Sequence, residues 1–185
     1  LPDRPRALLK QYRERDKHLN SIGSVDYHIH TRHSPDCRVP ASVVVDTAIR
    51  RGLTEIAVTD HDTIAGGVET RRYAEGKPIK VIVGAEINTD QGEVIGLNLK
   101  EEISERRLIE VLRIIKDQGG QAMVPHPYGI LRRKRLKVPI DSLKCMVDII
   151  EIHNGRSLFG GHDHLALAIA IRLNLQKVVG SDAHF

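Results

Sequence analysis

Short β-branched runs alternate with amphipathic stretches along most of this chain. The runs predict strands at residues 25–30, 55–60, 80–89, 93–99, 121–125, 147–153 and 177–180. The amphipathic stretches predict helices at 40–51, 65–75, 104–118, 140–145 and 161–173. Pro40 and Gly52 are typical of the two ends of the first of these helices, and Ser104 is expected to cap the third.

Alternation of strands and helices predicts an α/β fold with a mainly parallel sheet covered by helices. A closed or nearly closed barrel and an open doubly wound sheet both satisfy this order. Asp90-Gln91-Gly92 marks a hairpin turn between two of the strands. We expect residues 1–22 to form a charged leader and 23–185 a single domain. A further helix would normally follow the strand at 177–180, so the fold is expected to be truncated after its last recognised strand.

Charge is unevenly distributed over the 185 residues. The chain has 28 Lys and Arg against 24 Asp and Glu, a formal net charge of +4. Residues 1–18 hold six basic and three acidic side chains, and residues 132–137 hold five basic ones. The rest of the chain is therefore acidic. Because only 3% of the residues are aromatic, a nucleic-acid surface built on base stacking is poorly supported, and no stable duplex binding is expected.

The location is predicted to be cytoplasmic. Cys37 and Cys145 are the two cysteines, too few for a disulfide framework and typical of a reducing compartment. No apolar run approaches the roughly 18 residues of a membrane span, and no membrane partner is expected. The sequence does not indicate an oligomeric state.

Metal-ligating residue types gather where the predicted strands end. In a parallel barrel these ends meet at one rim, so distant segments bring several imidazoles and carboxylates into one pocket. His28 and His30 lie two apart on a strand and therefore point to the same face. A buried cluster of acids would repel itself unless cations neutralised it, and imidazole with carboxylate suits Zn, Mn or Fe. The residues at strand ends are His28, His30, Asp60, His61, Asp62, Glu86, His126, Glu151, His153, Asn154, Asp182 and His184.

Five short motifs carry a family resemblance. They begin at Asp26 (DYHIHT with SPD), Thr59 (TDHDT), Gly84 (GAEI), Pro125 (PHP) and Gly180 (GSDAH). In this order they resemble the motifs of the PHP (polymerase and histidinol phosphatase) domain family, in its stand-alone phosphoesterase form. The resemblance covers residues 25–185 and implies a distorted (β/α)7 TIM-like barrel with two or three divalent metal ions at its rim.

The resemblance also implies which residues hold the ions. Glu86 would bridge the first two ions, and Glu93 stands where many members have a His. Glu93 is therefore either a carboxylate ligand or the mark of a weaker second site. The implied ligands are His28, His30, Glu86 and Asp182 for the first ion, Glu86, His126 and Glu93 for the second, and Asp36, His61 and His184 for the third.

The function implied is hydrolysis of a phosphate ester by metal-activated hydroxide. The substrate would be a small metabolite, a nucleotide or a short oligonucleotide. Arg132, Arg133 and Arg156 are expected to bind its phosphate, because the guanidinium fork matches phosphate oxygens. Asp182 or His184 is expected to move a proton to the leaving oxygen. Two alternatives are an amidohydrolase-like C–N hydrolase and a non-catalytic metal-binding accessory domain.

Overall fold

A seven-stranded sheet forms the centre of the protein. The computed structural model describes residues 24–128, 135–157 and 163–184. The strands lie side by side in chain order, and all neighbours are parallel except the pairs that involve β4. Their bounds are β1 (Ser24–Ile29), β2 (Leu53–Val58), β3 (Lys80–Thr89), β4 (Gly92–Leu97), β5 (Gln121–Val124), β6 (Ile149–Asn154) and β7 (Gln176–Gly180).

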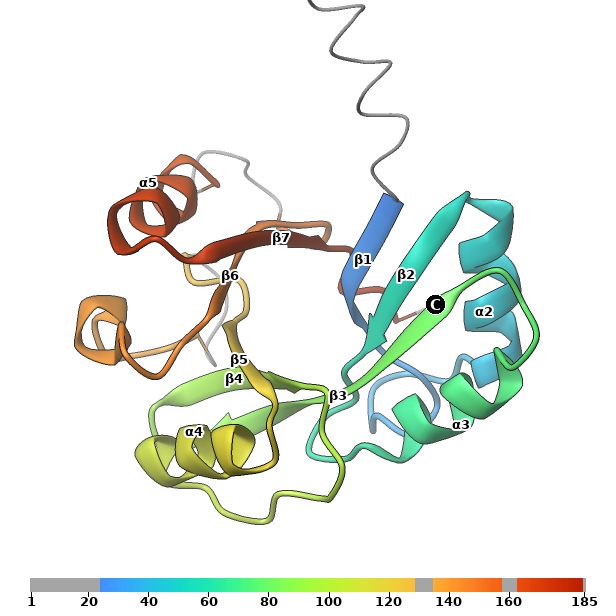
Figure 1. Cartoon of the computed structure of the whole chain (residues 1–185), viewed down its shortest axis with the longest axis horizontal. Coiled ribbons are helices and arrows are strands. Elements are labelled where there is room, and N and C mark those ends of the chain that lie inside the picture. Colours follow the sequence, from blue (N-terminus) through green and yellow to red (C-terminus); the bar gives the residue numbers. More distant parts are fainter. Residues whose placement is uncertain (1–23, 129–134, 158–162, 185) are drawn as a thin grey trace, which may run out of the picture.

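The first and last strands meet, so the sheet is a nearly closed barrel (Figure 1). Ile29 forms an isolated parallel bridge with Ala183, just beyond β7. The Asp182 amide donates to the His28 carbonyl at 2.7 Å, and the His30 amide donates to the Ala183 carbonyl at 3.1 Å. This closure selects the barrel over the open sheet and confirms the distorted TIM-like barrel.

Helices cover the outside of the strands, and three apolar clusters hold the layers together (Figure 1). Alternation along the strands separates the two faces, as expected for period-two side chains. Ile82, Ile95 and Met123 belong to the cluster inside the barrel. The outer elements are α2 (Ala41–Arg50), α3 (Ala65–Tyr73), α4 (Leu108–Asp117), α5 (Asp163–Leu173) and the short 3-10 helix η1 (Ile140–Leu143).

One local prediction is wrong. Ser104 does not cap α4, which begins four residues later, after Arg107 in an extended conformation. The Leu108 amide donates to Asp90 Oδ1 instead, so a carboxylate from the β3–β4 turn takes the place of a local cap. The short helix expected at 140–145 is present as the 3-10 helix η1, two residues shorter. The predicted leader, residues 1–22, lies outside the described residues.

Within the described residues, no helix combines the length and the apolarity needed to cross a membrane.

Candidate metal centre

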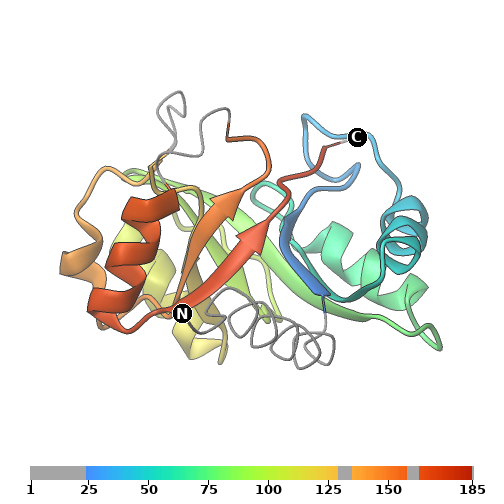
Figure 2. The same cartoon turned by 90° about the horizontal axis from the view of Figure 1, so that it is seen from above.

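The predicted ligands converge at the carboxyl ends of the strands. Figure 2 shows the segment that follows β7 beside the loop that follows β1. Six of the nine side chains are buried. They come from β1, β3, β4, the end of β5 and the end of β7. His61 and His184 are partly exposed, and Asp36 is the most exposed.

Ligand atoms of His28, His30 and Glu86 form a compact group, and Asp182 lies beside its two imidazoles. His28 Nε2 and His30 Nε2 lie 3.1 Å apart, and both face Glu86 Oε2, at 3.3 and 3.4 Å. Asp182 Oδ1 lies 3.8 Å from His28 Nε2 and 3.6 Å from His30 Nε2. A tetrahedral shell with bonds of ~2.0–2.1 Å places its ligand atoms about 3.3–3.4 Å apart. His28, His30 and Glu86 therefore have close to the spacing of a coordination shell, and Asp182 groups with His28 and His126 beside them.

The far side of each imidazole has its own hydrogen-bond partner. His28 Nδ1 faces Glu151 Oε1 at 3.2 Å, and a carboxylate can only accept, so this nitrogen carries the proton. His30 Nδ1 lies 2.9 Å from Ser34 Oγ, which donates its own proton to Asp60. Ser34 must then accept from His30. In the neutral rings, both Nε2 lone pairs point into the shared group.

Glu86 links this group to a second one. Its Oε1 atom lies 3.0 Å from His126 Nε2. Its Oε2 atom, which faces His28 and His30, also lies 3.3 Å from His61 Nδ1. Glu93, on β4, places one oxygen 3.8 Å from His61 Nδ1 and the other 3.8 Å from His126 Nε2. Glu93 is buried and points into the barrel, two residues before Ile95 on the same face.

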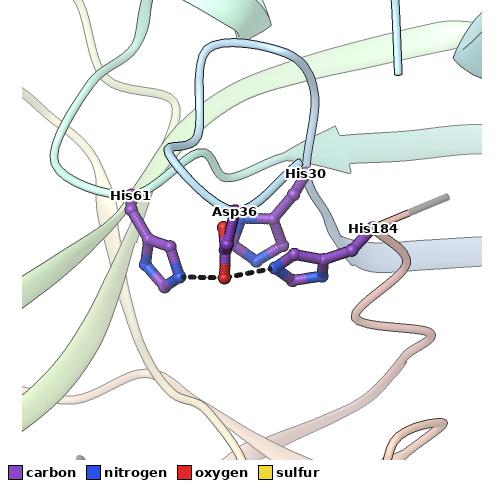
Figure 3. Close-up of side chains that lie close together, drawn as sticks. All are labelled: His30, Asp36, His61 and His184. Atoms are coloured by element: carbon purple, nitrogen blue, oxygen red, sulfur yellow. Dashed lines mark hydrogen bonds and ion pairs between the residues drawn. The ribbon is translucent and has the colours of Figure 1, made fainter. Parts of the chain in front are cut away.

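Asp36 lies between two imidazoles at the outer edge of the site (Figure 3). Its Oδ2 atom is 3.6 Å from His61 Nε2 and 3.1 Å from His184 Nε2. Together with His30, these residues form a group whose ligand atoms lie within 4.8 Å of one another. The loop after β1 thus brings Asp36 to the site beside His61 and His184.

Two of the side chains are carried by backbone in the left-handed region. His126 has φ 28° and Asp182 has φ 55°, a conformation that non-glycine residues rarely adopt. Gly180 precedes Asp182 on the same segment, and a Cβ there would come 2.2 Å from Glu151 Oε1 and 2.4 Å from His28 Cβ. Such strain is typical of functional sites.

Electrostatics in the group are dominated by His–carboxylate pairs. Burial alone would lower the pKa of His28, but the charges of Glu86 and Glu151 raise it well above its usual value. Burial lowers the pKa of His30. Burial would raise the pKa of Glu86, yet the facing imidazoles hold it well below its usual range. Without a cation, His28 therefore holds a proton that an ion can replace.

The donor set fits divalent metal ions. Imidazole nitrogens and carboxylate oxygens are the ligands that Zn, Mn and Fe accept. His61 Nδ1 is buried and has no hydrogen-bond partner among the described residues, although it faces the two carboxylates Glu86 and Glu93. A buried polar atom left in this way is costly, and a bound cation removes the cost.

Two carboxylates beside the site support it without contacting an imidazole ring. Asp26 accepts from the amides of His28 and Ser181, and Asp60 accepts from Thr31 and Ser34, so neither touches an imidazole directly. Sequence reasoning assigned no role to Glu151 or Ser34. Their positions at a strand end and inside the first motif were the available signals.

The predicted phosphate-binding arginines are only partly described. Arg156 follows β6, and its Nη1 atom lies 3.1 Å from His184 Nδ1 and 3.6 Å from Asp182 Oδ1. Its side chain is 47% exposed, so it can turn toward a ligand at the rim. Arg132 and Arg133 lie outside the described residues.

Comparison with known proteins identifies the family. The family model described as PHP domain matches residues 26–180. An uncharacterized protein of Methanocaldococcus jannaschii is 40% identical over 163 residues, which are 82% of this chain and 94% of that protein. The chain belongs to the PHP domain family.

Solved structures agree on the architecture. A two-domain protein of Bacteroides vulgatus, described as containing a predicted PHP-like metal-dependent phosphoesterase, matches with a TM-score of 0.72 and 25% identity. The match covers 86% of this chain and 51% of that one, so this chain spans about half of its length. An amidohydrolase of Chromobacterium violaceum with bound sulfate and no metal matches with a TM-score of 0.70, 18% identity and 88% coverage of each chain, which shows the fold alone.

Proposed function

We propose that this protein is a metal-dependent phosphoesterase whose active site is the rim described above. The carrying observation is the contact between His28 Nε2 and His30 Nε2, 3.1 Å apart with Glu86 and Asp182 beside them. Two imidazole nitrogens this close need a proton or a cation between them, and a divalent ion can take the place of the proton that His28 holds. Membership of the PHP domain family and the likeness to a protein described as a PHP-like metal-dependent phosphoesterase support the same reading.

Two or three divalent ions of Zn, Mn or Fe are proposed. The first would be held by His28, His30, Glu86 and Asp182, the second by Glu86, His126 and Glu93, and the third by Asp36, His61 and His184. Divalent ions at this rim would activate water and neutralise the charge on the phosphoryl oxygens. The contribution of the chain is to fix the ligand spacing and to hold the supporting hydrogen bonds of Ser34 and Glu151.

Arg156 is proposed to bind the phosphate of the substrate. Its guanidinium lies at the rim beside His184, and its planar fork can donate two hydrogen bonds to one phosphate group. The backbone around it is set by a turn in which the Arg156 amide donates to Asn154 Oδ1 at 3.0 Å. The roles of Arg132 and Arg133 stay predictions.

Asp182 or His184 is proposed to deliver a proton to the leaving oxygen. His184 Nδ1 lies 3.4 Å from Asp182 Oδ1, and the His184 side chain is only 7% exposed. The pair therefore forms a short path for a proton at the edge of the site next to Arg156. The substrate class is a small phosphorylated metabolite, a nucleotide or a short oligonucleotide.

Hydrolysis of p-nitrophenyl phosphate and of bis(p-nitrophenyl) phosphate tests the proposal. Purified protein should release nitrophenol only when Mn²⁺ or Zn²⁺ is added, and Glu86→Ala and His126→Ala should abolish the release. A matched control is Glu55→Gln, which changes a carboxylate bonded to Tyr27 and Lys80 at the start of β2, the other end of the barrel. Release of ammonia from amide substrates in place of nitrophenol would favour an amidohydrolase. Metal binding with no turnover on either substrate class would favour an accessory domain.

A further inference from the structure

Asp62, the residue after the predicted ligand His61, has an unusual backbone conformation. Its φ angle is 59°, in the left-handed region that residues other than glycine rarely adopt. Asp and Asn tolerate this region better than other side chains, but the conformation still has a cost and persists only where the surroundings fix it. Contacts from elsewhere in the chain must therefore hold Asp62 in the turn after β2.

Asn88 on β3 supplies most of these contacts. Asp62 Oδ1 accepts from the Asn88 amide and Asp62 Oδ2 from Asn88 Nδ2, both at 2.9 Å, and the two bonds form a clamp between the turn and the strand. The Asp62 amide donates to the Glu86 carbonyl at 2.9 Å, beside an isolated bridge between His61 and Glu86. Arg106 Nη2 lies 3.5 Å from Asp62 Oδ1, but the Arg106 side chain is 46% exposed, so this pair contributes little.

The ring of His61 depends on its backbone more than the ring of His28 does. The His28 ring is oriented by the contact of its Nδ1 atom with Glu151. The Nδ1 atom of His61 has no hydrogen-bond partner among the described residues, and its Nε2 atom lies 3.6 Å from Asp36 Oδ2, which is too far for a hydrogen bond. The direction of the His61 ring is therefore set by the turn that carries it.

We propose that Asp62 is a positioning residue, whose clamp to Asn88 takes the place of a hydrogen-bond partner for the His61 ring. This inference rests on the proposed metal centre and adds the part of the chain that holds one of its ligands. Asn88 pairs in register with Glu93 and lies two residues after Glu86. The clamp thus holds His61 in a fixed place beside the carboxylates of the hairpin, and its loss should weaken the binding of the ion that His61 holds.

Titration with Mn²⁺ tests this role without a turnover assay. The full chain is stripped with chelator, and the electron paramagnetic resonance of free Mn²⁺ during the titration gives the number of bound ions and their affinities. Asp62→Gly adopts the same φ freely but makes no side-chain bond. It should weaken the binding of one ion about tenfold, as for the loss of other partners of a ligand, and leave any other ion within about twofold of wild type.

A conservative variant and a matched control separate the clamp from the backbone. Asp62→Asn should bind Mn²⁺ like wild type, because Asn also adopts the left-handed region and its amide can pair with the carboxamide of Asn88 once that group turns over. Asn98→Gly should have no effect. Asn98 has the same φ of 59°, but it is exposed and follows β4 beside the start of β5, at the other end of the barrel.

A variant on the partner strand keeps the test informative if Asp62→Gly does not fold. Asn88→Ala removes one of the two bonds and should weaken the binding of the same ion. The double variant should bind this ion no more weakly than Asp62→Gly alone, because both changes remove one interaction.

Three results would overturn the inference. Asp62→Gly and Asn88→Ala could bind every ion as wild type does, or could weaken all ions equally, which would indicate a general loss of structure. Asp62→Asn could be as weak as Asp62→Gly, which would make charge decisive in place of the hydrogen bonds. Failure of wild type to bind any Mn²⁺ would instead overturn the proposed metal centre itself, and the inference with it.

Discussion

His28 Nδ1 lies 3.2 Å from the Oε1 atom of Glu151, and both side chains are buried. The other oxygen of Glu151 accepts from the His126 amide at 2.6 Å and from Asn154 Nδ2 at 3.1 Å. One carboxylate therefore ties together the ends of β1, β5 and β6. It also fixes which nitrogen of His28 faces the metal centre.

Replacing this carboxylate tests its role as a positioning group. Glu151→Gln keeps the size of the side chain but loses the charge that holds the His28 proton. We expect metal affinity to fall about 10–100-fold, as for other partners that orient a ligating imidazole. Competition with a chromophoric chelator measures this. Glu55→Gln is the matched control, and equal affinities for the two variants would contradict the role.

Gly180 gives a prediction about packing. A methyl group there would meet Glu151 Oε1 and the Cβ atom of His28, so Gly180→Ala must displace one of them. We expect a loss of about 1–3 kcal/mol in the free energy of unfolding from overpacking. Urea denaturation measures it. Val179→Ala, at an exposed neighbour on β7, should cost much less, and an equal cost would show that the close approach is unimportant.

The raised pKa of His28 predicts how the metal-free protein responds to pH. Folding raises this pKa, so the folded state binds a proton more tightly, and His28 adds stability below about pH 6.5, the ordinary pKa of histidine. That stability is lost as the pH rises through the folded pKa. The melting-temperature difference between wild type and His28→Asn, both in chelator, should therefore shrink from pH 6 toward pH 9.

Metal provides the control for the pH series. An ion takes the place of the proton on His28, so with saturating Mn²⁺ or Zn²⁺ the wild type should stay stable at the alkaline end. A difference between the two proteins that grows with pH in chelator would contradict the assignment of the raised pKa to His28.

Arg156 gives a prediction about substrate binding. Arg156→Ala should raise KM for p-nitrophenyl phosphate about tenfold, because one bidentate ionic contact is lost, and Arg156→Lys should not restore it. Steady-state kinetics measure both. Arg172→Ala removes a guanidinium that pairs with Asp141 far from the rim, and it should leave KM unchanged. Equal effects of Arg156→Ala and Arg172→Ala would exclude a phosphate role for Arg156.

Sequence patterns predict most of this fold because the local signals are strong. Seven β-branched runs and four of the amphipathic stretches correspond to strands and α-helices of the barrel, because burial on one or both faces sets their periodicity. The cap of α4 escapes prediction, since Leu108 is bonded by Asp90 from 18 residues away.

In the site, too, local patterns are predicted from the sequence and long-range contacts are not. His28 and His30 are apparent from their spacing on one strand. The inward direction of Glu93 depends on its register against Asn88. The contact of Glu151 with His28 joins residues 123 positions apart. Such long-range contacts leave no periodic signal in the sequence.

Anomalous diffraction from crystals grown with Zn²⁺ tests the central claim most directly. The account predicts a peak bonded to His28 Nε2, His30 Nε2, Glu86 and Asp182, with bonds of ~2.0–2.1 Å. It would be contradicted by crystals in which this position holds no anomalous scatterer and the two imidazoles remain in contact through a proton.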